Sequence, residues 1–262
     1  MARIVVTICR DNEMNNAIGL IVGSGFESLG LAVTSRSPTK TPYGTPSSPV
    51  LAVTIGATQI ACIARHGENH AIPPHAVNYR ANIWSLYQHG VRQCLAINAV
   101  GAIDASFSPG TLAVPDQLID YTWGREHTFF AGDGTLEHIE FSEPLDPEIR
   151  GRMADAIAAA GGSVRAGTCG VTQGPRLETA AEIDRLERDG CHMVGMTALP
   201  EAALAREIGM AYAICAIAVN FAAGRHPDGV PIHAELERHT QRGMGIARVA
   251  LEKLVSDLPD PT

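Results

Sequence analysis

The sequence predicts an α/β protein with one domain built around a largely buried central β-sheet. Short apolar runs alternate with segments of helical character along the whole chain, which is the pattern of consecutive βαβ units. Neither an internal repeat nor a low-complexity tract interrupts this alternation, and no linker divides it. The 262 residues, of which 45% are hydrophobic, suffice for the core of one domain.

Eight short apolar runs are expected to form strands, and the second and third flank Gly56-Ala57-Thr58 as a hairpin would. The runs comprise residues 17–22, 50–55, 59–64, 94–100, 111–115, 117–121, 191–194 and 212–219. Five helices are expected, and capping residues or glycines mark several of their ends. They cover residues 78–89, Pro147 to Gly161, Thr179 to Gly190, a segment from about Pro200, and residues 232–254.

The formal net charge of −8 argues against general attraction to nucleic acid or to an anionic membrane. An anionic substrate would therefore have to be captured by a local pocket. The six cysteines form no CxxC pair and mostly interrupt apolar runs, which favours reduced thiols in a cytoplasmic protein.

The N-terminal segment is expected to lie outside the domain. Its apolar run, residues 4–9, is too short for a signal sequence and is followed at once by charged residues, so neither secretion nor a membrane span is implied. Residues 1–16 are interpreted as a poorly ordered extension, and residues 17–257 as the single domain.

Two strand ends carry residues that could bind an anion. Gly23, Ser24 and Gly25 follow the first strand, where small residues let N–H groups and a hydroxyl converge; a plain tight turn is the alternative. Gly30 comes too late for a GxGxxG motif, which disfavours dinucleotide binding.

Arg65 and His66 end another strand, and a guanidinium fork there could bind phosphate through two hydrogen bonds. A surface arginine and a core histidine are the alternatives.

Four further polar residues stand at the ends of apolar runs. Asn98 and Asn220 each end a strand, and Asn98 could instead tie down the loop that follows. Glu178 could simply favour a helix N-terminus, and Thr197 could cap one. The ends of strands in an open α/β sheet are where ligands usually bind.

A metal site is not expected. His70 and His75 lie in a loop that contains Pro73-Pro74, and no pair of histidines shows the spacing of a helical metal motif.

The chain resembles the family of trimeric purine nucleoside phosphorylases and methylthioadenosine phosphorylases. Six motifs carry the resemblance in order: GSG at 23–25, ARHG at 64–67, PHAVNYRANIW at 74–84, NAVG at 98–101, GPRLET at 174–179 and GMTALPE at 195–201. The resemblance covers residues 18–254. The resemblance implies a mixed, twisted, partly barrel-like central sheet flanked by helices, and a homotrimer or a dimer of trimers. It implies no cofactor, with inorganic phosphate as co-substrate of a small nucleoside.

The resemblance also implies roles for the residues singled out above. Phosphate would contact Ser24, Arg65, His66, Thr197 and the N–H of Ala99, with Asn98 beside them, while Met196 would lie against the ribose. Asn220 and Glu178 would bind the purine, near Leu177 and Ala222. His70, Leu236 and His138 would face the 5′ substituent, although surface or interface packing is an equal alternative for Leu236 and His138.

The base side predicts a 6-oxopurine. Relatives that cleave 6-aminopurine nucleosides usually carry Asp at the positions of Asn220 and Ala222 and Ser at that of Glu178. A 6-oxopurine presents a carbonyl at C6 and a donor at N1, which match an amide and a carboxylate.

The expected reaction is phosphorolysis of 5′-methylthioinosine, because HGENH at 66–70 resembles the methylthioadenosine branch. The alternatives are a phosphorylase of inosine or guanosine, a methylthioadenosine phosphorylase with a changed base site, a hydrolase, and a catalytically silent purine-binding protein.

Overall fold

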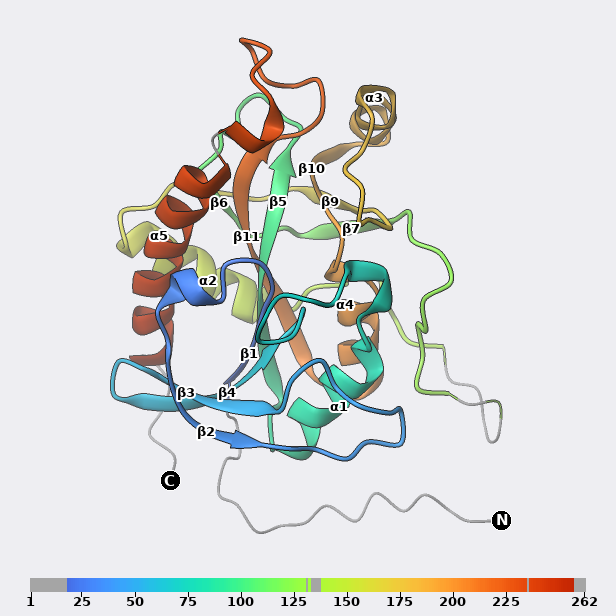
Figure 1. Cartoon of the computed structure of the whole chain (residues 1–262), viewed down its shortest axis with the longest axis vertical. Coiled ribbons are helices and arrows are strands. Elements are labelled where there is room, and N and C mark those ends of the chain that lie inside the picture. The colour runs from blue at the N-terminus through green and yellow to red at the C-terminus, as the bar shows by residue number, and fades with distance from the viewer. Residues whose placement is uncertain (1–17, 131, 133–137, 235, 257–262) are drawn as a thin grey trace.

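A computed structural model describes residues 18–130, 132, 138–234 and 236–256 (Figure 1). The expected extension, residues 1–16, lies outside the described residues. The elements follow one another as β1 (Ile18–Val22), η1 (Glu27–Leu29), β2 (Ala32–Ser37), β3 (Val50–Ile55), β4 (Thr58–Ala64), η2 (Pro74–Ala76), α1 (Tyr79–Gln88), β5 (Gln93–Ala102), β6 (Leu112–Ala113), β7 (Gln117–Asp120), α2 (Pro147–Ala159), β8 (Val164–Arg165), β9 (Thr168–Val171), α3 (Ala180–Arg188), β10 (Cys191–Gly195), α4 (Ala198–Glu207), β11 (Ala211–Phe221), η3 (Ile232–Ala234) and α5 (Leu236–Ser256).

The strands form one mixed sheet in the order β2-β3-β4-β1-β5-β10-β9-β7, and β11 branches from β5 to pair with β6, which pairs with β8. β1, β4, β5 and β11 are parallel neighbours, whereas β10 joins β5 antiparallel. The α/β class and the mixed sheet are therefore confirmed. Among the described strands the sheet is not closed, because β2 and β7 lie at its ends.

The two faces of the sheet are covered by different helices, which Figure 1 shows on opposite sides of β5 and β11. Strand alternation divides the core: Leu20 and Val22 of β1 pack with residues of α2 and α5, whereas Ile21 packs with residues of α1 and α4. β5 and β11 are buried on both faces, as expected for parallel strands between helices.

The expected helix starts are confirmed where side chains cap them. Asn78 and Asp146 each accept a hydrogen bond from the N–H three residues later, and Thr179 and Glu182 form a complete capping box. The last long helix starts later than expected, since η3 precedes α5.

The sequence analysis did not predict β2, β8 or β9. β2 pairs only with β3 among the described strands and is largely exposed, so its side chains lack an apolar pattern. β8 and β9 are two and four residues long. β5 and β11 also extend past their predicted ends at residues 100 and 219, so Asn220, which was expected to follow its strand, lies within β11.

The part of the chain that the structure describes has no helix both long and apolar enough to span a bilayer.

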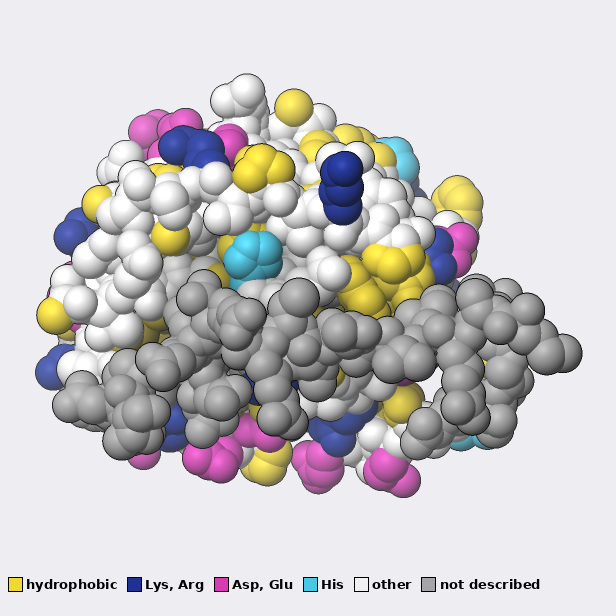
Figure 2. Space-filling view, turned by 90° about the horizontal axis from the view of Figure 1, so that it is seen from below, with side chains coloured by type: hydrophobic (Ala, Val, Ile, Leu, Met, Phe, Trp, Pro, Cys, Tyr) yellow, Lys and Arg dark blue, Asp and Glu magenta, His cyan; other side chains and the backbone are white. Residues whose placement is uncertain are grey.

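On the face shown in Figure 2, the visible basic side chains stand apart from one another, and acidic ones are interspersed along the rim.

Candidate active site

The candidate site lies where the edge of β5 changes its partner strand. β1 pairs with residues 93–97 of β5 and β10 with residues 101–102 of the same strand, while β11 runs along β5 from Gln93 to Ala102. Gly23 follows β1 and donates its N–H to Ile97 O at 3.3 Å. Because alternate residues of a strand direct their N–H groups to alternate edges, Ala99 directs its N–H toward the same edge as Ile97. A backbone donor without a strand partner is suited to binding an anion.

A cavity of about 620 Å³ opens at this edge, within the size range of small-molecule sites. It brings together most of the predicted site residues, namely Ser24, Arg65, His66, His70, Ala99, Leu177, Glu178, Met196, Thr197, Asn220, Ala222 and Leu236. Asn98 lies behind the cavity wall, and His138 is exposed on the surface and does not line the cavity. The roles of all these residues stay predictions.

Arg65 lines the cavity, and a fully buried hydrogen-bond network holds its guanidinium in place. Its Nε and Nη2 donate to the two carboxylate oxygens of Glu201, at 2.8 and 2.7 Å, and Nη2 also donates to Asn98 Oδ1 at 2.8 Å. Tyr212 adds a third hydrogen bond to this carboxylate, at 2.7 Å on Oε2. Arg65 and Glu201 are 1% and 0% exposed, so each charge is compensated by the other.

This network corrects the expectation that the Arg65 fork binds phosphate through two hydrogen bonds. Glu201 occupies the edge of the guanidinium that carries Nε and Nη2. The nitrogen that remains is Nη1, which lies 3.4 Å from Ile97 O and beside Gly23. A Cβ atom at position 23 would lie 2.6 Å from Nη1, so this position requires glycine.

Ser24 and His70 meet beside His66. His70 Nε2 lies 3.4 Å from Ser24 Oγ. The rings of His66 and His70 contact edge to face, with 4.8 Å between their centroids. His70 reaches this place with a φ of 51°, a conformation that costs energy in a non-glycine residue. His70 therefore lies on the side of the cavity with Ser24 and His66, which are the residues expected to bind phosphate.

His66 is held in one tautomer. Its Nδ1 lies 2.7 Å from Ile72 O, and because a carbonyl oxygen only accepts, Nδ1 carries the hydrogen. Burial is the main cause that lowers the pKa of His66 to about 4, the Arg65 charge adds to it, and the bond to Ile72 opposes it. The ring is therefore neutral near pH 7.

Thr197 and Met196 precede α4 and are fixed by Arg125, which the sequence analysis did not single out. Thr197 is the N-cap of α4 but makes no capping hydrogen bond with its side chain, and it lines the cavity. Arg125 donates to the backbone oxygens of Met196 and Leu199, at 2.8 and 2.7 Å, and to that of Gln173 at 2.9 Å. It thereby joins the segment before α4 to the segment after β9.

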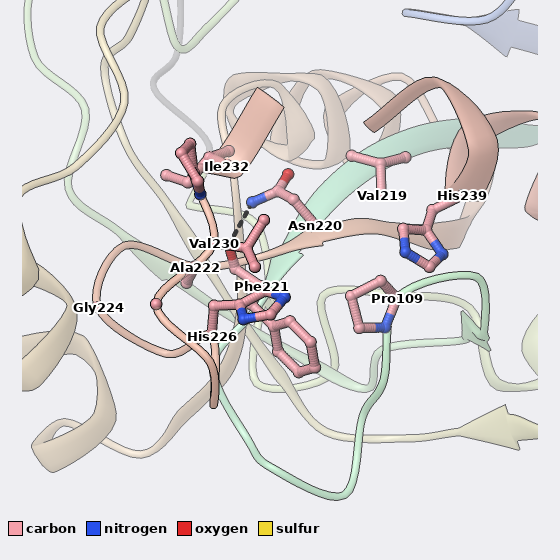
Figure 3. A pocket seen from close by; sticks show the side chains of 12 residues that line it. Pro109, Val219, Asn220, Phe221, Ala222, Gly224, His226, Val230, Ile232 and His239 are labelled. Atoms are coloured by element: carbon pink, nitrogen blue, oxygen red, sulfur yellow. Dashed lines mark hydrogen bonds between the residues drawn. The ribbon is translucent and has the colours of Figure 1, made fainter. Parts of the chain in front are cut away.

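Asn220 is aimed into the cavity by an irregularity in β11. The pairing of β11 with β5 shifts between Ala218 and Asn220, so that Asn220 lies opposite Gly101. A Cβ atom at position 101 would lie 3.3 Å from Asn220 Nδ2, and the glycine gives the amide this room. Asn220 Nδ2 donates to Phe221 O at 2.6 Å, the dashed line in Figure 3.

A smaller cavity of about 200 Å³, whose lining is drawn in Figure 3, also contains Asn220 in its wall. It shares Val219, Asn220, Ala222 and Ile232 with the large cavity, so the two cavities adjoin at Asn220.

Glu178 faces the cavity from the segment before α3. Its Oε1 accepts a hydrogen bond from Thr172 Oγ1 at 2.5 Å, which orients the carboxylate. Ile72, Pro73, Pro74, Ile232 and Leu236 form an apolar part of the cavity wall. Among the described residues, no three metal-binding side chains lie close enough together to hold a metal ion.

A strand edge with hydrogen-bond donors beside a cavity of this size is typical of an enzyme that binds a small molecule. A family model described as "Phosphorylase superfamily" matches residues 17–256. The chain belongs to this superfamily.

Two curated relatives and one solved structure illustrate the similarity. The chain is 47% identical over 240 residues to a probable S-methyl-5′-thioinosine phosphorylase of Pseudomonas syringae, covering 90% of this chain and 97% of that protein. It is 42% identical over 214 residues to the 6-oxopurine nucleoside phosphorylase of Pyrococcus furiosus, covering 79% and 80% of the two chains. Methylthioadenosine phosphorylase from Schistosoma mansoni in complex with adenine superimposes with a TM-score of 0.85 at 30% identity, covering 92% and 91%.

The neutral state of His66 predicts a pH dependence of stability. The folded pKa of about 4 lies below the unfolded value near 6.5, so the unfolded chain binds more protons between these values. Stability contributed by neutral His66 is therefore lost as the pH falls through this window. In chemical denaturation without phosphate, the free energy of unfolding should fall between pH 7.5 and pH 5 by about 2 kcal/mol more in the native protein than in His66→Gln. Equal falls in both proteins would contradict the buried, neutral state.

Proposed function

We propose that the protein cleaves the N-glycosidic bond of a 6-oxopurine nucleoside by phosphorolysis, with S-methyl-5′-thioinosine as the substrate. The products would be hypoxanthine and 5-methylthioribose 1-phosphate. The observation that carries the proposal is that Asn220 and Glu178 line the same cavity as Ser24, Arg65 and Thr197.

In this reaction phosphate attacks C1′ of the sugar while the bond to the purine breaks. The transition state has oxocarbenium character, as in glycoside cleavage, so the phosphate charge stabilises the sugar. Ser24 Oγ, Arg65 Nη1, the Ala99 N–H and Thr197 Oγ1 would hold the phosphate at the cavity wall. Positioning two reactants side by side supplies a large part of the rate enhancement.

Asn220 would assist departure of the base. Negative charge grows on the purine as it leaves, and a donor that bonds N7 or O6 more strongly in the transition state lowers the barrier. Among the described residues, Asn220 Nδ2 bonds only Phe221 O, which leaves its second hydrogen for the base. Asparagine stays a donor at any pH of interest, whereas an ionised aspartate does not.

Glu178 would select the 6-oxo form. Thr172 occupies Oε1, and Oε2 could accept from the N1–H of a 6-oxopurine. A 6-aminopurine presents an N1 lone pair instead, which repels a carboxylate. An unpaired polar group in such a site costs roughly 1–3 kcal/mol.

The 5′ side supports a methylthio group over a hydroxyl. The apolar wall of Ile72, Pro73, Pro74, Ile232 and Leu236 fits a thioether better than a polar 5′ group. Relatives named for thioinosine, for 6-oxopurine nucleosides and for thioadenosine all match this chain, which agrees with a site that joins a 6-oxopurine to a 5′-methylthio sugar.

A comparison of S-methyl-5′-thioinosine, inosine and S-methyl-5′-thioadenosine tests the assignment. We expect the largest kcat/KM with methylthioinosine, no turnover when phosphate is omitted, and release of hypoxanthine measured by chromatography. Highest efficiency with inosine would assign an unmodified nucleoside instead, and highest efficiency with methylthioadenosine would refute the role of Glu178 and Asn220.

The substitution Asn220→Asp tests the base side alone. An aspartate can accept a hydrogen bond from the exocyclic amine of a 6-aminopurine but cannot donate to N7 or O6. The ratio of kcat/KM for methylthioinosine to that for methylthioadenosine should fall roughly ten- to hundredfold. The KM for phosphate serves as the internal control, and an unchanged nucleoside ratio would exclude Asn220 as the discriminating residue.

We also propose a cytoplasmic homotrimer, an assembly that the resemblance implies and in which a neighbouring subunit would complete the site near residues 128–130. In this subunit the segment is anchored by Glu207, which accepts from Thr128 Oγ1 at 2.5 Å and from Phe129 N at 2.8 Å. Light scattering coupled to gel filtration should give three times, or six times, the 27.7 kDa chain mass. A monomer at assay concentration would refute this proposal.

A further inference from the structure

We propose that Glu201 and Tyr212 are positioning residues for phosphate, which fix the Arg65 guanidinium so that a single nitrogen, Nη1, meets the anion. The inference rests on the proposed function, since it takes the cavity wall at Ser24 and Arg65 as the phosphate site. Neither residue lines the cavity, and each would act only through Arg65.

The hydrogen atoms of Arg65 determine which part of it can bind a ligand. A guanidinium carries five N–H groups in one plane. The Nε hydrogen goes to Glu201 Oε1, and the two Nη2 hydrogens go to Glu201 Oε2 and Asn98 Oδ1. One Nη1 hydrogen lies toward Ile97 O at 3.4 Å. The remaining Nη1 hydrogen is the one available beside Gly23.

Tyr212 stabilises the Glu201 carboxylate, which holds Nε and Nη2 of Arg65. Its hydroxyl donates to Glu201 Oε2, the same oxygen that Arg65 Nη2 bonds. Burial raises the pKa of Tyr212 well above its usual value, so the hydroxyl remains a donor. Tyr212 is 2% exposed, and a phenylalanine would keep the packing of its ring while removing only this hydrogen bond.

The network also joins the separate elements of the phosphate wall. Glu201 lies one turn after Thr197 on α4, and Asn98 directly precedes Ala99 on β5. Arg65 follows β4, and Tyr212 lies on β11. Loosening Glu201 would therefore misplace Arg65 relative to Thr197 and Ala99. Glu178 lies before α3, and Asn220 is set by its pairing with Gly101, so base binding depends less on this network.

Because its charge is compensated, Arg65 would bind phosphate mainly through one correctly oriented N–H group and less through its net charge. The Glu201 carboxylate compensates its charge, and His66 is neutral near pH 7. Phosphate would be held by oriented donors, namely Arg65 Nη1, the Ala99 N–H and two hydroxyls. An error in the orientation of one donor then weakens binding directly.

The test compares Tyr212→Phe with Tyr121→Phe as a matched control. Tyr121 also donates to a carboxylate at 2.7 Å, that of Asp189, but it lies outside the large cavity. Tyr212→Phe should raise the KM for phosphate about three- to tenfold and leave the KM for the nucleoside within about twofold. Tyr121→Phe should leave the KM for phosphate unchanged.

A second variant and a binding measurement complete the test. Glu201→Gln should raise the KM for phosphate more than Tyr212→Phe does, and the double variant should resemble Glu201→Gln alone, because Tyr212 acts through Glu201. If Glu201→Gln, which removes the counter-charge of buried Arg65, is too unstable to assay, Tyr212→Phe carries the test by itself.

Titration calorimetry with inorganic phosphate, without nucleoside, should show the same loss of affinity in the variants. Phosphate binding that weakens in this way, without turnover of any nucleoside, would refute the proposed function and support this inference. An unchanged phosphate affinity in Tyr212→Phe, an equal change in Tyr121→Phe, or additive effects in the double variant would overturn it.

Discussion

The buried pair of Arg65 and Glu201 is the interaction on which the candidate site depends. It joins β4 to α4 across the end of β1, and Asn98 and Tyr212 attach β5 and β11 to the same point. Each charge makes the burial of the other possible, since an unpaired charge in this place would cost several kcal/mol. The pair therefore holds the end of β4, the middle of β5, the beginning of β11 and the first turns of α4 in one arrangement beside the candidate site.

Much of the site could be predicted because its residues interrupt a regular pattern. Ser24, Arg65, Thr197 and Asn220 are polar residues next to long apolar runs, and parallel strands bring such ends together. The glycines of the motifs also have physical reasons: Gly23 makes room for Arg65 Nη1, and Gly101 makes room for the Asn220 amide. The order of these motifs indicated the fold class as well.

The features that sequence reasoning missed depend on distant or weakly patterned partners. Glu201 is 136 residues from Arg65, and Tyr212 reads as the start of an apolar strand, so their bond to each other leaves no local signal. Because nothing near Arg65 in the sequence indicates Glu201 as its partner, the fork of Arg65 was expected to be available for phosphate. β2 escaped prediction because an exposed edge strand lacks alternation. Arg125 escaped it because most of its partners are backbone oxygens, those of Thr172, Gln173, Met196 and Leu199.

The division of the cavity into a phosphate wall and a base wall is the central claim, and a crystal structure with phosphate and hypoxanthine tests it most directly. Phosphate should lie against Arg65 Nη1 and the Ala99 N–H, with Glu201 still on Nε and Nη2, while the hypoxanthine N1–H bonds Glu178 and Asn220 donates to N7 or O6. Phosphate bound by the Arg65 fork, or hypoxanthine bound without Glu178 and Asn220, would contradict it.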